Sequence, residues 1–426
     1  MGYVAVRGGG KAIEESLKLL EYQRVSASSA WGTDEIEGTF PELVDQVMGE
    51  ASLYAPRLAA LALKQAQGSP DEAVFLLRAF RSTLERPYVS RPVDTGAMRV
   101  NRRVSAAFKD VPGGQVLGAT RDYSHRLLAF DLETEGAEEL AEKRAELAAH
   151  FEKVAEALEA ASDVVLGAPQ TPAALPRVLD YLRAQGLIAH VEADDAPPVD
   201  ATMAPLSFPA PRSVRLQTLA RGMTQAVEAL GYAAIRGFGP AHPTVGELRS
   251  GRVAVAVDHP LEAGGEQDAY YLGSVPVTEV ESVFESEGES DADGGTATAT
   301  RSDGGGLSLA IGYGLVFGRA ETKAIAMSVL DHCLERGDKR FPTEDEEFVL
   351  YHVDGVEATG FISHLKLPHY VTFQSKLSSV RGTRDEHSEC GECDPHGTRV
   401  AHDPQSTRDP HDQPAESKEA CDAAAL

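Results

Sequence analysis

The chain has 426 residues, and its 66 Asp and Glu residues against 40 Lys and Arg residues give a formal net charge of −26. At roughly 150 residues per domain this length suggests two or three domains, and a hydrophobic content of 42% is enough for a sizeable core. So negative a surface repels phosphate-rich partners, which argues against general nucleic-acid binding and against docking on anionic lipid. The acidity is typical of a halophile-like protein from a salt-rich cytoplasm, where ions screen the repulsion between carboxylates.

Targeting and disulfide signals are missing from the sequence. No apolar run approaches the roughly 18 residues that a membrane-spanning helix needs, and the first residues do not form a signal peptide. Four cysteines in a chain this long do not make a disulfide scaffold. We therefore expect a cytoplasmic protein that does not interact with membranes.

Helical spacing of apolar residues dominates the first part of the chain. A short strand over residues 3–6 and a glycine turn precede a helix that begins at Lys11. Helices follow over residues 40–50 and 57–66, and Ser69 is the predicted N-cap of a third. A long amphipathic helix is expected further along, over residues 137–161, and its apolar stripe consists of Leu140, Leu147, Phe151, Val154 and Leu158.

The second part mixes helices with short strands. The predicted helices are 176–185, 214–230 and 312–334, and the predicted strands are 252–257, 269–272 and 275–280. Glycine and clustered acidic residues make 285–306 a flexible surface insertion, and 381–426, which has few apolar residues, a disordered acidic tail.

These elements predict an α+β fold with short antiparallel strands and two domains joined by irregular connections. The N-terminal domain takes residues 1–165 and a proline-rich connection takes 166–212. The C-terminal domain takes residues 213–380 and precedes the tail.

A basic window interrupts the acidic chain over residues 94–126. It holds six basic and three acidic residues, a local charge of +3. Arginine forks can bind phosphate oxygens bidentately, so the window is a candidate site for a phosphorylated ligand. The alternative is that these arginines pair with neighbouring carboxylates on the surface. Candidate ligands and acid–base groups in the window are Arg102, Arg103, Lys109, Asp110, Gly113, Gly114, Tyr123, His125 and Arg126.

Individual residues of the window suit different tasks. Gly113 and Gly114 form a turn that would let the backbone approach a ligand closely. His125 can act as a general acid or base near neutral pH, or hydrogen-bond a phosphate, or serve only as a structural hydrogen-bonding group.

Two histidines, His364 and His369, form a second candidate site. A separation of five residues puts them on different faces of a helix or a strand, so only a turn around residues 366–368 would let them share a metal ion. From spacing alone the pair is either a metal site or two unrelated side chains, because two imidazoles leave half of a tetrahedron unfilled. Cys390 and Cys393, near several tail histidines, could also bind zinc, but the surrounding tail has nothing to pack as a folded domain.

Six blocks of the sequence resemble the I subunit family of the carbon–phosphorus lyase system (PhnI). They are residues 3–16, 61–84, 102–132, 236–251, 312–327 and 345–377, the last reading DEEFVLYHVDGVEATGFISHLKLPHYVTFQSKL. Ordered agreement over most of the chain is far more specific than a short motif.

The resemblance implies a role in phosphonate breakdown. The family subunit works with subunits G, H and L to displace adenine from ATP, the substrate as Mg-ATP, with methylphosphonate. The product is α-D-ribose 1-methylphosphonate 5-triphosphate, and the subunit alone is a purine nucleosidase. The family assembles with G, H and J in a two-fold symmetric core complex, and subunit K is a further partner. It also holds a zinc ion on a histidine pair that looks like His364 and His369.

The residues support roles within that reaction. We expect Arg102, Arg103, Lys109 and Arg126 to bind phosphate or phosphonate oxygens, with Asp110 and His125 as acid–base groups. Alternatives are a non-catalytic zinc-bearing scaffold of the core complex and an independent purine nucleosidase.

Overall fold

Four antiparallel strands form one sheet in the order β1–β2–β3–β4. They are β1 (Arg99–Val104), β2 (Thr244–Asp258), β3 (Ala269–Glu285) and β4 (Leu309–Phe317). The computed structural model describes residues 9–26, 30–165, 175–188, 198–238, 242–260, 269–285, 308–367 and 369–391. The mixed α+β class is confirmed.

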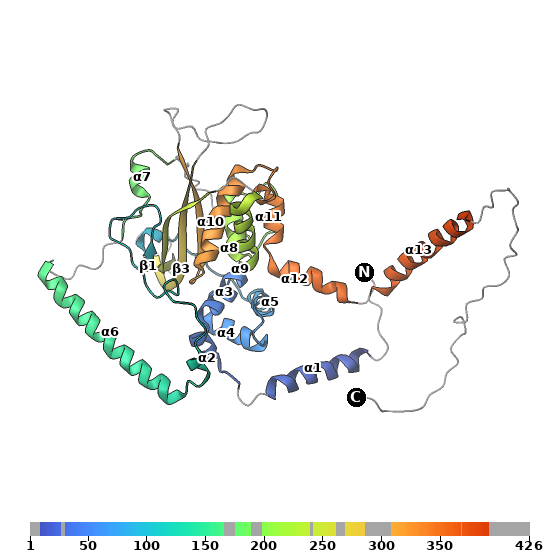
Figure 1. Cartoon of the computed structure of the whole chain (residues 1–426), viewed down its shortest axis with the longest axis horizontal. Coiled ribbons are helices and arrows are strands. Elements are labelled where there is room, and N and C mark those ends of the chain that lie inside the picture. Colours follow the sequence, from blue (N-terminus) through green and yellow to red (C-terminus); the bar gives the residue numbers. More distant parts are fainter. Residues whose placement is uncertain are drawn as a thin grey trace. The chain divides into compact units, whose positions relative to one another are not determined.

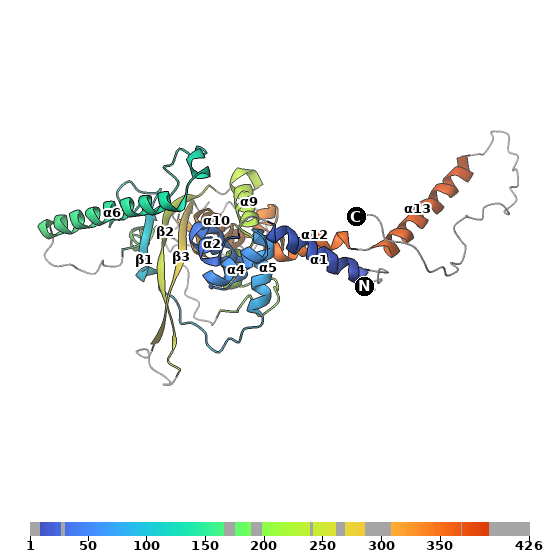
Figure 2. The ribbon, with the colours of Figure 1, turned by 90° about the horizontal axis from the view of Figure 1, so that it is seen from below.

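The two middle strands are longer than the sequence predicted. β2 pairs with β3 from Thr244 to Asp258, whereas β1 pairs only with the middle of β2 and β4 only with the second half of β3. A two-stranded ribbon therefore extends beyond β1 and β4 (Figure 2). The strands predicted over 269–272 and 275–280 are parts of one strand, continuous through Gly273.

One helix begins later in the chain than the sequence predicts. Residues 312–318 were expected to open a helix, but they belong to β4, and the helix α10 begins only at Glu321 and ends at Arg336. In β4 the residues of the buried face alternate with half-buried ones, as in a strand. Two of the buried positions, Gly312 and Gly314, lack side chains, so the alternation is invisible to a search for apolar residues.

One face of the sheet is covered by helices. α10 packs across β3 and β4, and α8 (Arg212–Arg221) and α9 (Thr224–Ala233) lie against it (Figure 1). The helix predicted over 214–230 is thus two helices, because the chain turns at Gly222 and Met223. The core between sheet and helices includes Leu248, Val280, Val316, Leu330 and Val227. α11 (Glu346–His352) contacts α8 at its edge.

A second core lies among four helices from the first part of the sequence (Figure 1). They are α2 (Thr33–Thr39), α3 (Pro41–Ala51), α4 (Pro56–Gln65) and α5 (Pro70–Arg81). The last three match predicted helices, and the Ser69 hydroxyl accepts a hydrogen bond from the Glu72 amide as a helix cap should. α3 also contacts β4 and α8.

The remaining helices bury little apolar surface. α1 (Gly9–Val25) has no buried residue, and α6 (Ala137–Val165) confirms the long helix, although its stripe residues Leu147 and Phe151 are exposed. α7 (Asp180–Ala184) is shorter than the helix predicted over 176–185.

The C-terminal elements are α12 (Gly355–Ser363) and α13 (Tyr370–Gly391). The tail predicted to be disordered from residue 381 is helical as far as Gly391. The strand at 3–6, most of the acidic insertion and residues 392–426 lie outside the described residues.

The chain divides into two compact units, one spanning Val6–Ser363 and one containing His364–Leu426. β1, from the predicted N-terminal domain, pairs with β2, from the predicted C-terminal domain. The domain boundaries of the sequence analysis stay a prediction.

Candidate functional site

Arg102 lies at the sheet end of the basic window and is buried. Its guanidinium pairs with Glu321 at 2.8 Å and Asp122 at 2.5 Å, and it donates a hydrogen bond to the Leu117 carbonyl. Only 7% of its side chain is exposed. Arg102 thus ties the loop after β1 to the start of α10.

Arg103 is more deeply enclosed, with none of its side chain exposed. Its Nε donates to Glu247 at 2.6 Å, and its terminal nitrogens donate to the carbonyls of Pro112, Gly114 and Pro176. Gly113 and Gly114 have φ values of +84° and +76°, a region that favours glycine, so the turn that Arg103 holds needs both of them. For Arg102 and Arg103 the structure shows pairing with carboxylates and carbonyls, and their role as phosphate ligands stays a prediction.

The remaining candidate residues of the window face solvent. Lys109, Asp110 and His125 are exposed, and within the described residues no hydrogen bond or ion pair joins Asp110 to His125. Tyr123 is 69% exposed, and the Arg126 side chain lies 3.8 Å from Asp122.

This cationic loop, residues 121–126, is attached to the helices near the N-terminus. Arg121 forms an ion pair with Glu42 of α3. The loop presents an imidazole and a guanidinium to solvent. Both groups can bind an anion, and an imidazole is also a general acid or base.

Behind the window lies a buried ionic network that the sequence analysis missed. Arg249 on β2 and Glu279 on β3 are cross-strand partners, each 2% exposed, and pair at 2.5 Å. Their polar neighbours on the same face of the sheet are Glu247, Glu281, Tyr313, Thr95 and Arg177. Charged residues alternating along β2 and β3 were a signal that could have revealed it.

The network keeps its central carboxylate ionised. Burial alone would raise the pKa of Glu279, but hydrogen bonds from Thr95 and Arg249 hold that pKa below its usual range. Burial, and then the nearby charge of Glu279, raises the pKa of the Tyr313 hydroxyl, which donates to Glu279 at 2.9 Å. Arg103 lies beside this network: it pairs with Glu247, which alternates with Arg249 on β2 and whose other oxygen accepts from the Val178 amide. The network therefore supports the strand that carries the candidate site.

The two predicted metal ligands come close together. The ring centres of His364 and His369 are 5.5 Å apart, and His364 begins a 3₁₀ turn that ends at Lys366. Two imidazoles on one tetrahedral zinc have ring centres about 5 Å apart, so the pair fits a shared ion. Nδ1 of His369 lies 2.6 Å from the Leu367 carbonyl. This contact would occupy Nδ1 and leave Nε2 as the ring nitrogen that could bind a metal ion.

Further ligands are not gathered around this pair. In the described parts of the chain, no cluster of three or more His, Cys, Asp or Glu residues could hold a metal. Cys393 and the tail histidines His396, His402 and His411 lie outside the described residues, so the tail site is untested. None of the described helices is long and apolar enough to span a membrane.

Known proteins resemble this chain over most of its length. It is 42% identical over 393 residues to the "Putative C-P lyase subunit protein HtxH" of Stutzerimonas stutzeri, covering 91% of this chain and 97% of that protein. It is also 42% identical to two proteins named "Alpha-D-ribose 1-methylphosphonate 5-triphosphate synthase subunit PhnI". The match to that of Rhizobium meliloti (strain 1021) covers 90% of this chain and 95% of the relative. The match to that of Escherichia coli (strain K12) covers 90% and 99%.

The profile of one protein family, described as "Bacterial phosphonate metabolism protein (PhnI)", matches residues 2–387. The match includes the basic window, the buried network behind it and the histidine pair. This chain therefore belongs to the PhnI family of bacterial phosphonate metabolism proteins.

Proposed function

We propose that this protein is a subunit of a carbon–phosphorus lyase system and transfers the ribose triphosphate of ATP from adenine to methylphosphonate. The observation that carries the proposal is the 42% identity, over 90% of the chain, to two proteins named as subunits of the synthase of that product. The solvent-facing cations of the basic window support it, because both substrates are multiply anionic.

The proposed reaction is a displacement at the anomeric carbon of ribose. An oxygen of methylphosphonate forms a bond to C1′, the bond from C1′ to N9 of adenine breaks, and adenine leaves with its bonding electrons and a proton. The transition state has oxocarbenium character, and a proton donor to the base lowers its energy.

The exposed residues take the chemical roles in this proposal. Lys109 and Arg126 bind phosphate or phosphonate oxygens, and Asp110 and His125 are the acid–base candidates. Arg102 and Arg103 would act as positioning residues, since their donors hold the loop and turn beside β1.

Release of adenine from ATP tests the proposal directly. Protein mixed with partner subunits is incubated with ATP, with and without methylphosphonate, and adenine and the ribose phosphonate are measured by chromatography. We expect methylphosphonate to convert ATP into the new product, and the protein alone to release adenine by hydrolysis. Absence of adenine in both mixtures would contradict the proposal and favour a scaffold role.

We also propose that His364 and His369 hold zinc, on the strength of their 5.5 Å ring separation. Bound there, zinc would hold the turn together and offer its remaining positions to further ligands. Zinc content of the purified protein should fall in His364→Ala and His369→Ala and remain in His352→Ala, whose ring lies in α11. Equal zinc in all the proteins would refute the assignment.

The partners in this proposal are the G, H, J, L and K subunits, in a two-fold symmetric core complex in the cytoplasm. The supporting observation is that the names of the relatives describe subunits. Copurification with these subunits, and the mass of the complex in solution, test it.

A further inference from the structure

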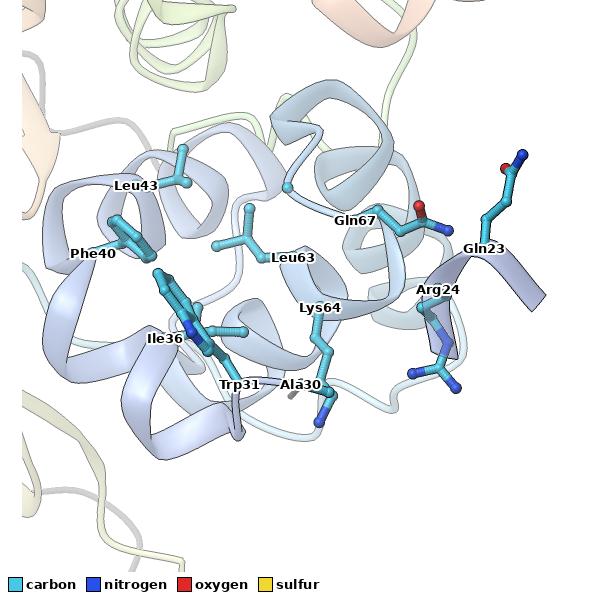
Figure 3. A pocket seen from close by; sticks show the side chains of 11 residues that line it. Gln23, Arg24, Ala30, Trp31, Ile36, Phe40, Leu43, Leu63, Lys64 and Gln67 are labelled. Atoms are coloured by element: carbon cyan, nitrogen blue, oxygen red, sulfur yellow. The ribbon is translucent and has the colours of Figure 1, made fainter. Parts of the chain in front are cut away.

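A groove of about 560 Å³ lies among α2, α3 and α4 and beside the end of α1, apart from the residues assigned so far. Its volume falls within the range of small-molecule sites in proteins, about 300–1,000 Å³. Figure 3 shows its lining side chains, of which Ile36, Leu43 and Leu63 supply aliphatic surface.

An aromatic pair forms one wall of the groove. The rings of Trp31 and Phe40 are stacked, with centres 5.0 Å apart and planes 22° apart. Trp31 is 53% exposed and Phe40 38% exposed, so the pair is not enclosed by its own helices. An accessible aromatic surface beside an aliphatic one suits a flat, largely apolar ring system.

The polar lining residues favour an anion attached to that ring. They are Gln23, Arg24, Lys64 and Gln67, and the lining contains no Asp or Glu although the chain has a net charge of −26. Arg24 pairs with Glu21, whereas Lys64 has no ion-pair partner among the described residues. In a chain that repels anions at long range, a lysine without a carboxylate partner at a groove reverses the sign of the charge locally.

The groove and the cationic loop both contact helix α3. Leu43 lines the groove, and the neighbouring residue Glu42 forms the ion pair with Arg121 of that loop. A ligand whose ring lies in the groove would therefore have the loop close to the same stretch of α3.

We infer that this groove binds the purine base of a nucleotide, with the ring against Trp31 and Phe40 and an anionic group near Lys64. The inference rests on the proposed function, since it assigns the base-binding part of the same substrate site. It adds a recognition element that lies outside the basic window.

Trp31 is the only tryptophan of the chain, so its fluorescence reports on this groove alone. The full-length protein is titrated with adenosine, AMP and ribose 5-phosphate, with free tryptophan as the correction for absorbance. We expect saturable quenching by adenosine and AMP, tighter binding of AMP, and no effect of ribose 5-phosphate, which lacks the ring.

Two variants, each with a matched control, assign the contacts. Phe40→Leu should raise the Kd of adenosine and AMP about tenfold, because it removes one stacked ring. Phe75→Leu, an equal change at an exposed residue of α5 outside the groove, should leave both unchanged. Lys64→Gln should weaken AMP and spare adenosine, whereas Lys18→Gln, on exposed α1, should weaken neither.

The results separate this inference from the proposed function. No saturable quenching by adenosine or AMP, or equal quenching by ribose 5-phosphate, would overturn the inference. So would a Trp31 response to partner subunits alone, which would make the groove a protein-docking surface. If Phe40→Leu does not affect adenine release, the proposed function stands but the groove has no part in it. If the groove binds nucleotide and no mixture releases adenine, the inference stands and the proposed function is contradicted.

Discussion

Two arginines of the basic window differ completely in how far they are exposed to solvent. Arg99 and Arg103 both lie on β1, yet Arg99 is exposed and Arg103 is completely buried against Glu247 and three carbonyls. The buried guanidinium stabilises the fold, and the residues available to a ligand are those of the following loops. Mutational effects in this window must therefore be divided between stability and chemistry.

Arg103→Ala should lower the free energy of unfolding by about 3–5 kcal/mol, because Glu247 would keep a buried charge without its partner. Arg99→Ala is the matched control and should change stability by less than about 0.5 kcal/mol. Denaturant unfolding followed by circular dichroism measures both. Equal stability of Arg103→Ala and the wild type would show that the buried pair contributes nothing.

His125→Ala should instead lower adenine release from ATP by about a hundredfold, the usual contribution of a general acid or base, with unchanged stability. His150→Ala, at an exposed position of α6, is the control and should retain the wild-type rate. A wild-type rate in His125→Ala would remove this residue from the proposed mechanism.

His332 should make stability depend on pH. Burial, and then the charge of Arg336, lowers the pKa of its imidazole to about 4, and its ring stacks on Phe284 at 3.9 Å. The unfolded chain binds a proton near pH 6.5 and the folded chain only near pH 4, so stability falls as the pH drops through this window. The loss amounts to about 3 kcal/mol.

The variant His332→Leu should lose about 3 kcal/mol less than the wild type between pH 6.5 and pH 4. The exposed His150→Leu should follow the wild type. Parallel curves for His332→Leu and the wild type would contradict the assignment, since the carboxylates titrate in both proteins.

At the scale of elements, two glycines decide how closely α10 approaches the sheet. A Cβ atom at Gly312 would lie 2.0 Å from the Ser328 carbonyl oxygen, and one at Gly314 would lie 2.1 Å from that of Ala324. The helix backbone therefore rests directly on β4, and the Ser282 and Ser328 hydroxyls meet beside it at 2.7 Å. The same glycines hid the strand from the sequence analysis.

Gly314→Ala should cost about 1–3 kcal/mol of stability, because the helix must move to admit a methyl group. Gly38→Ala in α2, where a Cβ atom would meet nothing within 4 Å, should raise stability by up to about 1 kcal/mol. Thermal unfolding of both variants provides the comparison. A Gly314→Ala protein as stable as the wild type would mean that α10 has room to shift.

At the scale of the whole molecule, the net charge of −26 should make stability increase with salt. At 1 M salt the screening length is about 3 Å, so repulsion between distant carboxylates is largely removed. The free energy of unfolding should rise from low to high KCl and should not follow the same course with sucrose, an uncharged solute. A flat or falling response to KCl would refute the hypothesis of salt adaptation.

The sequence by itself determined the family, the mixed α+β class and most helices. Apolar spacing located α3, α4, α5 and α6, and Ser69 marked a helix start, because these signals are local. It also indicated that His364 and His369 could share a metal ion only across a turn; their rings lie 5.5 Å apart, and the metal site itself stays a prediction. It could not locate β4, since strand pairing joins residues far apart in the chain and glycines leave no hydrophobic pattern.

Only the tertiary structure decided which charges of the basic window are available. Arg103 and Lys109 are both basic residues of the same window. Arg103, however, is enclosed by the Pro112 carbonyl and by Glu247 and the Pro176 carbonyl, which come from distant segments. Burial depends on what the rest of the chain places around a side chain, and local composition carries no information on that. The same reason hid the groove at Trp31, whose lining comes from separate helices that only folding brings together.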